Sequence, residues 1–169
     1  MTCPSCGAPL CLTENDDSWR CEYCRATYMP DNTGDGVRLL GEPSPLACPV
    51  CAVPLEQAAL AGRRILACAR CRGILIGMEE FVAILDELRA KRSGPGGVQT
   101  AADRRGFERH IDCPQCHHPM DTHFYEGGGN IIIDDCSRCL LNWLDQGELM
   151  RVVLAPGREY PEETYAGQR

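Results

Sequence analysis

The sequence predicts a small metal-stabilised α+β fold, built from three tandem units and not around one large core. An eight-residue phrase, Cys-Pro-x-Cys-x-x-Pro followed by Leu or Met, begins at residues 3, 48 and 113. The composition holds 17 Gly, 12 Pro and 13 Cys but only three Phe and two Trp, so little apolar core can form. Small units with little core usually need a metal or disulfides to stay folded.

The spacing of the cysteines favours metal over disulfides. Twelve of the 13 Cys form six Cys-x-x-Cys pairs, and Cys11 is left over. Two Cys three residues apart in a tight turn seldom bridge each other as a structural staple. We expect no signal peptide before the first pair, because Cys3 follows Met-Thr directly. No apolar run approaches the roughly 18 residues of a membrane span, so we expect a cytoplasmic protein with free thiols and no membrane contact.

Each repeated phrase is followed by a second Cys-x-x-Cys after a gap of 14, 16 or 19 residues, which is close to the spacing of four-Cys zinc sites. A structural zinc takes four ligands in a tetrahedron, and two facing Cys-x-x-Cys turns supply them. Redox dithiols are the weaker interpretation, because no βαβ pattern surrounds any pair. The sequence therefore predicts three zinc ions per chain. The predicted ligands are Cys3, Cys6, Cys21 and Cys24, then Cys48, Cys51, Cys68 and Cys71, then Cys113, Cys116, Cys136 and Cys139.

Each gap must hold a β-hairpin that brings its two cysteine turns together. Turn residues between strand-prone runs mark these hairpins at Asn15–Asp17, near Gly62 and at Gly127–Gly129. Three zinc ribbons in tandem follow from this pattern.

The repeat continues past the cysteines in the second and third units. CRGILIGMEEFVAIL aligns without a gap on CLLNWLDQGELMRVV, which places Leu75 on Trp143. Both runs predict a helix, and Asp145 with Glu148 forms a capping-box-like start in the third unit. In the first unit Pro30 stands where the helix would begin, so this unit is a bare ribbon. The predicted apolar helix faces are Phe81, Val82, Leu85 and Leu88 in the second unit, and Leu149, Val152 and Val153 in the third.

Charged residues support the helix of the second unit at both ends. Glu79 and Glu80 lie in its first turn, and Arg89, Lys91 and Arg92 lie at its C-terminal end. This distribution of charge is the one that the helix dipole favours.

The third unit, with its run NWLDQGEL, resembles the small zinc ribbon proteins named after the ribbon of transcription factor IIB. The second unit, with GILIGMEEF, is a looser match, and residues 1–29 match only as a generic ribbon. The resemblance covers residues 48–92 and 113–154. It implies a structural zinc on the matching cysteines and no catalytic residue, and it makes RNA polymerase or one of its regulators a candidate partner.

Many ribbons of this family carry Gly after the second Cys of a turn. Gly7 fits this pattern, whereas Ala52, Arg72, His117 and Leu140 depart from it. The departures concern the geometry of the turns more than their metal binding.

Segments rich in Gly, Pro and polar residues separate the units, which remain independent unless their helices pack together. The predicted organisation is zinc ribbon 1 at 1–30, a linker at 31–46, zinc ribbon 2 with its helix at 47–92, a linker at 93–110, zinc ribbon 3 with its helix at 111–155, and a polar tail at 156–169.

Charge argues against binding to nucleic acid. The formal charge is −7 with Cys neutral, and each four-thiolate zinc site adds two negative charges, which gives about −13 with three sites. Phosphate backbones are bound by Lys and Arg that release counterions. Of the three parts of the chain, only residues 41–96 have a positive net charge, with seven basic and six acidic side chains. The basic cluster in this unit is Arg63, Arg64, Arg70 and Arg72.

These observations favour a non-catalytic adaptor or regulatory protein that works through protein contacts. We expect no enzyme, because no Ser-His-Asp set, carboxylate pair, phosphate loop or open three-ligand zinc site can be identified. One alternative is a nucleic-acid-binding regulator that uses the basic second ribbon. The other is a rubredoxin-like iron protein for electron transfer, which also holds its metal with four Cys on two turns.

One apolar strip is the candidate partner face. Ile131, Ile132 and Ile133 are consecutive on one strand, so at least one of them points away from its own hairpin. Phe124 and Tyr125 on the opposite strand face opposite sides for the same reason. The strip either binds a protein partner or is covered by the helix of the second unit.

A few further residues have alternative interpretations. The four His residues are His110, His117, His118 and His123. We expect them to be exposed, with an additional metal ligand as the alternative. Cys11 is expected to be a buried or half-exposed thiol, and a redox role is the weaker interpretation. Trp143 and Leu144 are expected to pack the helix onto the ribbon, with partner binding as the alternative.

Overall fold

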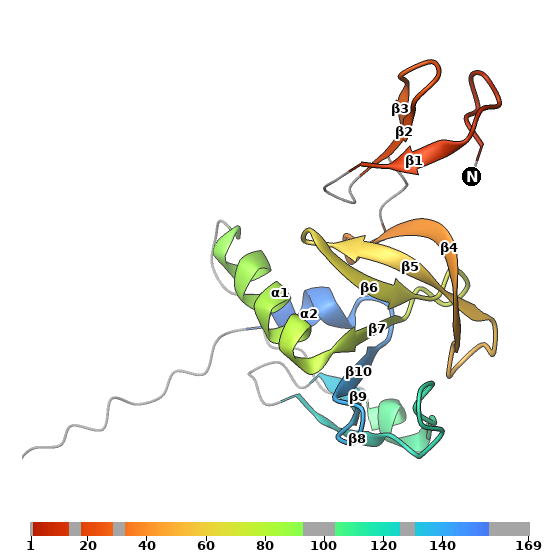
Figure 1. Cartoon of the computed structure of the whole chain (residues 1–169). Helices are drawn as coiled ribbons and strands as arrows, with labels where there is room; N and C mark the ends of the chain where they lie inside the picture. The colour runs from red at the N-terminus through yellow and green to blue at the C-terminus, as the bar shows by residue number, and fades with distance from the viewer. Residues whose placement is uncertain (1, 14–17, 29–32, 93–103, 126–130, 156–169) are drawn as a thin grey trace, which may run out of the picture.

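A computed structural model describes residues 2–13, 18–28, 33–92, 104–125 and 131–155. It contains a three-stranded sheet in the order β1-β2-β3 and a seven-stranded sheet in the order β4-β5-β6-β7-β10-β9-β8. Figure 1 shows the small sheet at one end of the molecule, beside β4 of the larger body. The elements are β1 (Leu10–Leu12), β2 (Trp19–Cys21), β3 (Thr27–Tyr28), β4 (Arg38–Ala47), β5 (Pro54–Leu60), β6 (Arg63–Ala67), β7 (Ile74–Gly77), α1 (Met78–Ala90), η1 (Arg104–Glu108), β8 (Asp121–Phe124), β9 (Ile132–Cys136), β10 (Leu141–Leu144) and α2 (Glu148–Leu154). The small α+β class is therefore correct.

The first ribbon is a hairpin with one additional strand. β1 pairs antiparallel with β2, and β2 pairs with β3. Leu10 and Trp19 form its small core, together with Leu40 of β4 and Ala59 of β5. No helix follows it among the described residues up to β4. The turn expected at Asn15–Asp17 and Pro30 lie outside the described residues.

The hairpins of the other two ribbons are present. β5 and β6 pair in register around Ala61 and Gly62, which both have positive φ, at 50° and 71°, as two-residue hairpin turns require. β8 and β9 pair antiparallel, with His123 opposite Ile133. Their connection, including the predicted turn at Gly127–Gly129, lies outside the described residues.

The second and third units join through β7 and β10 into one sheet. These strands pair antiparallel, with Ile74 opposite Leu144 and Gly77 opposite Leu141. Leu75 lies opposite Trp143, and these two residues occupy the same position of the internal repeat. A residue that pairs with its own repeat equivalent lies on a pseudo-two-fold axis. The two units are therefore arranged like the halves of a symmetric dimer within one chain.

The two helices lie side by side on one face of this sheet (Figure 1). The Arg89 side chain on α1 donates a hydrogen bond to the Val152 carbonyl on α2 at 2.9 Å, and Arg92 donates to the Val153 carbonyl at 3.3 Å. These arginines therefore also satisfy the C-terminal carbonyls of α2, the neighbouring helix, which contain the negative end of its dipole. Lys91 pairs instead with Glu87, at 2.6 Å.

The predicted apolar face of α1 is wrong at one position, because Val82 does not belong to it. Val82 is 57% exposed, whereas Ile84 is fully buried with Phe81 and Leu85. Positions 81, 84, 85 and 88 follow the helical spacing of one face, and position 82 is turned about 100° from 81. The predicted face of α2 is correct, because Leu149, Val152 and Val153 are all buried.

The segment expected as the first linker, 31–46, contains most of β4. This strand pairs with β5 at an irregular register and forms one edge of the large sheet. Pro43 and Pro45 are tolerated there because an edge strand needs only one side of its hydrogen bonds. Leu39 packs into the large core and Leu40 into the first ribbon, so β4 connects the two bodies.

Asp35, which precedes β4, caps α2 from 112 residues away along the chain. Its carboxylate accepts hydrogen bonds from the backbone N–H of Gly147 at 2.7 Å and of Met150 at 3.2 Å. Asp35 is only 1% exposed. A buried carboxylate at a helix N-terminus satisfies unpaired N–H groups and interacts favourably with the helix dipole.

Most of the apolar strip is covered within the chain, in part by the helix of the second unit as the second interpretation held, whereas Phe124 is 42% exposed. Ile131 and Ile133 pack in one core with Phe81 and Leu85 of α1, and Leu88 contacts this core. Ile132 points to the other face, where its side chain lies 3.2 Å from the Cβ position of Gly106 in η1. All three Ile are buried. The partner face must therefore be sought elsewhere.

Candidate metal centres

The structure brings each predicted set of four cysteines together. Within each set all four sulfur atoms lie within 4.8 Å of one another. The sets come from paired turns, one before the hairpin and one after it, as the sequence predicted. The first set is Cys3, Cys6, Cys21 and Cys24; the second is Cys48, Cys51, Cys68 and Cys71; the third is Cys113, Cys116, Cys136 and Cys139.

The sulfur positions fit a tetrahedral metal ion. Zinc–sulfur bonds of about 2.3 Å in a tetrahedron place the sulfurs roughly 3.8 Å apart. The contacts between the paired turns are 3.5 Å for Cys6 and Cys21, and 3.6 Å for Cys116 and Cys136. The geometry and the donor set are consistent with metal binding at all three centres.

All six cysteine turns share one backbone conformation. The residue after the second Cys has positive φ in every turn, from 54° at Leu140 to 74° at Gly7. Four of these residues also close their turn with a hydrogen bond, because the N–H groups of Gly7, Ala52, Arg72 and His117 donate to the carbonyl of the first Cys at 2.8–2.9 Å. The departures from Gly at Ala52, Arg72, His117 and Leu140 therefore leave the turn geometry intact, at a cost of about 1 kcal/mol or more each.

The pKa values of the clustered thiols indicate that a cation would help to deprotonate them. The Tyr28 hydroxyl, 3.3 Å from the Cys3 sulfur, lowers the pKa of Cys3 to about 6. The backbone N–H of His118 lowers the pKa of Cys116 to about 6, and burial raises the pKa of Cys139 to about 12. Neighbouring thiolates repel, so the four protons cannot all leave easily without a positive ion. A divalent metal replaces these protons and stabilises all four thiolates.

The second and third centres share a core on the sheet face opposite the helices. Trp143 and Leu75 lie in this core with Ile111, Met120 and the buried cysteines of both centres. Trp143 is fully buried, and its ring N–H donates to the Asp145 carboxylate at 3.1 Å. Leu144 alone packs under the helices. The expectation that both residues pack the helix onto the ribbon is thus correct for Leu144, whereas Trp143 packs at the junction of the two units.

Cys11 and the four His residues stay outside the metal clusters of the described chain. Cys11 is exposed on β1, opposite Arg20, and not buried or half-buried as expected. His118 contacts the Cys116 carbonyl at 2.9 Å, and His123 lies 3.0 Å from the Asp135 carboxylate.

The four arginines of the second unit form two separate pairs. Arg63 and Arg64 begin β6, and Arg70 and Arg72 lie in the cysteine turn beyond its other end. A strand of this length separates its ends by on the order of 15 Å. The structure therefore divides the basic cluster on which the nucleic-acid interpretation depended.

A partly buried charge network anchors the start of α2. Arg109 contacts Asp145 at 2.7 Å and Asp134 at 2.9 Å, so the end of the expected linker at 93–110 is tied to the third unit. The Asp145 N–H donates to the Glu148 carboxylate at 2.8 Å, which is the capping contact that the sequence predicted. Burial raises the pKa of Glu148 to about 7, and the Asp145 and Asp134 carboxylates act in the same direction.

Glu148→Gln is expected to flatten part of the pH dependence of stability. Because the folded-state pKa lies above the unfolded value of 4.5, the proton stabilises the folded chain below about pH 4.5, and this contribution is lost as pH rises through 7. Glutamine keeps the acceptor for the Asp145 N–H but carries no charge. Denaturant unfolding of zinc-saturated protein should show that the variant gains up to about 3 kcal/mol relative to the native chain between pH 5 and 8. Parallel stability profiles would contradict this assignment.

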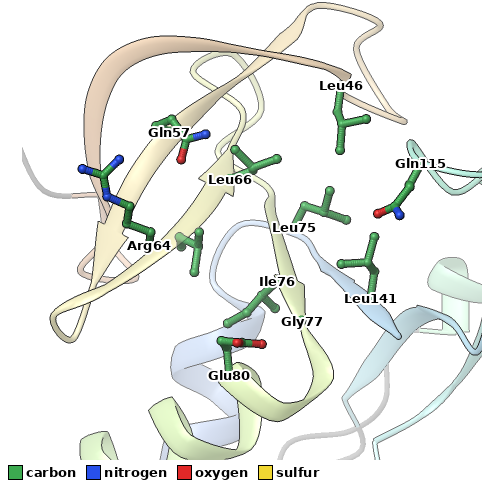
Figure 2. A pocket seen from close by; sticks show the side chains of 11 residues that line it. Leu46, Gln57, Arg64, Leu66, Leu75, Ile76, Gly77, Glu80, Gln115 and Leu141 are labelled. Carbon is green, nitrogen blue, oxygen red and sulfur yellow. The ribbon is translucent and has the colours of Figure 1, made fainter. Parts of the chain in front are cut away.

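Two hollows lie along the junction of the second and third units, and the first of them extends from the metal side of the sheet to Ile76 and Glu80 on the helix side. One hollow of about 260 Å³ opens where β6 and β7 diverge, and Figure 2 shows Leu46, Leu75 and Leu141 around it. A second hollow of about 430 Å³ lies between the first cysteine turns of the second and third ribbons. Leu46 and Gln115 line both hollows, so the two adjoin at these side chains. We call them together the junction groove.

The folded hairpins and their three four-sulfur clusters define a metal-binding protein of the zinc ribbon class. A family model described as transcription factor zinc-finger, the TFIIB-type zinc ribbon, matches residues 47–87 and 112–155, which are 85 of the 169 residues. The chain belongs to this family. The match covers the second and third ribbons with their helices, as the residues around Trp143 predicted. A search of curated proteins and a search of solved structures gave no match.

None of the helices in the described part of the chain is long and apolar enough to cross a membrane.

Proposed function

We propose that this protein is a non-catalytic, three-zinc adaptor that uses its paired ribbons to bind a protein of the transcription machinery. The observation that carries this proposal is the completeness of the three metal centres, each with four sulfur ligands from the chain itself. Catalytic zinc sites keep one position open for water or substrate, whereas sites closed by four protein ligands are structural. Zinc here maintains the shape of a binding surface.

The junction groove is the proposed contact surface. It exists only because the two units pair, and its lining combines leucines with the amides of Gln57 and Gln115. Apolar side chains provide area for a protein segment, and amides can hydrogen-bond an extended main chain. The family description names transcription factors, which makes RNA polymerase or one of its regulators the proposed partner. The net negative charge of the chain suits a protein surface better than a phosphate backbone.

The metal content of protein purified without added metal is expected to be three zinc ions per chain. Elemental analysis measures it, and a colourless solution is expected. A red protein with iron in place of zinc would support the rubredoxin-like interpretation, because four thiolates on two turns can hold either metal. A value near zero or one would contradict the proposal.

Binding to purified RNA polymerase from the source organism tests the partner. Leu46 lines both parts of the groove and is half-buried, so Leu46→Glu should reduce binding at least tenfold. Val82→Glu, on the exposed side of α1, is the matched control and should bind like the native chain. Failure of the native chain to bind polymerase would remove this partner, and equal binding by both variants would exclude the groove. A salt-dependent shift with DNA or RNA that is lost on replacing the four arginines would instead support the nucleic-acid alternative.

A further inference from the structure

The first metal centre is more open to solvent than the other two. Its ligands Cys6 and Cys24 are exposed, while Cys3 and Cys21 are buried. In the second and third centres the corresponding outer ligands are all half-buried, and they are Cys51, Cys71, Cys116 and Cys139. Only the first centre therefore presents two sulfur ligands directly to solvent.

This difference follows from the packing. The second and third centres lie against a common core that contains Trp143 and Leu75. The first ribbon has no helix among the described residues and contacts the body through Leu40 and Ala59. Tyr23, between the two ligands of the second turn, is 84% exposed, so the tip of this turn is uncovered.

The two exposed ligands lie within reach of each other, although each is nearer, at 3.5 Å, to a buried ligand of the facing turn. Cys6 and Cys24 come from different turns, and their sulfurs lie within 4.8 Å. A disulfide has a bond of about 2.05 Å, so the sulfurs need to approach by less than about 3 Å. The buried ligands have additional contacts: the Tyr28 hydroxyl lies 3.3 Å from the Cys3 sulfur, and the Cys24 N–H donates to the Cys21 sulfur at 3.5 Å. Exposure selects Cys6 and Cys24 as the ligands that an oxidant reaches first.

We propose that Cys6 and Cys24 are an oxidation site, at which a hydroperoxide converts the two thiolates to a disulfide and releases the first metal ion. One thiolate attacks a peroxide oxygen, the O–O bond breaks, and a sulfenic acid and hydroxide form. The second thiolate attacks the sulfenic sulfur and displaces a second hydroxide. Two protons from the buffer neutralise the two hydroxides, so two thiolates, two protons and one hydrogen peroxide give one disulfide and two waters. With only two thiolates left, the metal dissociates as the hydrated ion.

Loss of the first centre would change the surface of the remaining protein. Leu40 and Ala59 are buried at 0% and 2% exposure by the first ribbon and its neighbours. Unfolding of this ribbon uncovers them on β4 and β5, while the seven-stranded sheet keeps its own core and two metal centres. The oxidised chain would thus present a new apolar patch, so the first ribbon would act as a redox-controlled cover.

The test adds hydrogen peroxide to the full chain loaded with three zinc ions, in the presence of a chromogenic zinc chelator. About one zinc per chain should be released in a phase at least tenfold faster than the rest. Peptide mass spectrometry should find a disulfide between Cys6 and Cys24, and dithiothreitol with zinc should restore the starting state. Release of all three ions at one rate, or earlier oxidation of Cys51, Cys71, Cys116 or Cys139, would overturn the proposal.

Cys11→Ser is the matched control, because Cys11 is also exposed but belongs to no cluster. The variant should keep the fast phase, and loss of this phase would assign the reaction to Cys11 and overturn the proposal. The inference rests on the proposed zinc function, which the metal content of the starting protein measures separately. A zinc content near zero or one before peroxide would contradict that function, whereas three ions without selective release would contradict only this inference.

Discussion

Replacing Cys136 by Ser is expected to unfold the second and third units together, while the first ribbon keeps its metal. Cys136 ends β9, is 3% exposed and supplies one of the four sulfurs of the third centre. Structural zinc contributes on the order of 10–16 kcal/mol of apparent folding free energy in such small units, which exceeds the stability of most domains. β9 pairs with β10, and β10 pairs with β7 of the second unit. Unfolding of the third unit should therefore extend through the β10–β7 pairing into the second unit.

Elemental analysis and limited proteolysis check this result. The zinc content should fall from three to about one per chain, and protease should cut within both family-matched units but not within the first ribbon. Cys11→Ser is the control, because it removes a thiol that belongs to no cluster. A variant that loses only one zinc and keeps residues 47–92 resistant would show that the two units fold independently, as the sequence alone suggested.

The metal ligands could be predicted from sequence because their spacing is local. A Cys-x-x-Cys turn places two sulfurs on one side whatever surrounds it, so all twelve sulfurs fall into the predicted sets. The hairpin at Gly62 and the apolar face of α2 also depend on near neighbours. These features required no knowledge of how the units pack.

The junction and its supports depend on long-range contacts that no local pattern reveals. In the sequence Asp35 is one polar residue of an expected linker, yet in the structure it caps a helix 112 residues away. β4 contains Gly41, Pro43 and Pro45, which disfavour a strand by composition and are accommodated only at an edge. One signal was available: Leu75 and Trp143 align in the repeat, and repeated modules with exposed strand edges can pair with each other.

Gly73→Ala is expected to destabilise the junction strongly for so small a change. Gly73 precedes β7, and the Cβ position built on it lies 2.8 Å from Cη2 and 2.9 Å from Cε2 of Trp143. Real Cβ atoms do not approach other heavy atoms this closely. Trp143 is fully buried, so its ring cannot move aside without disturbing the core that lines the second and third centres. Overpacking of this kind typically costs about 1–3 kcal/mol.

The same contact explains why the third unit pairs with the second and not with a copy of itself. In the repeat, Leu141 occupies the position of Gly73. Two copies of the third unit would therefore bring Trp143 against Leu141, where the structure has Trp143 against a residue without a side chain. The indole and the glycine thus act as complementary shapes that favour pairing within the chain.

A double-mutant cycle separates this contact from general damage. Trp143→Leu alone should destabilise the chain by a few kcal/mol because it leaves a cavity. In that background Gly73→Ala should cost clearly less, with a coupling energy of at least about 1 kcal/mol in denaturant unfolding of zinc-saturated protein. Gly34→Ala is the control, because nothing lies within 4 Å of its Cβ position, and it should leave stability nearly unchanged. Additive effects of the two substitutions would show that Gly73 and Trp143 act independently and would refute this account of the pairing.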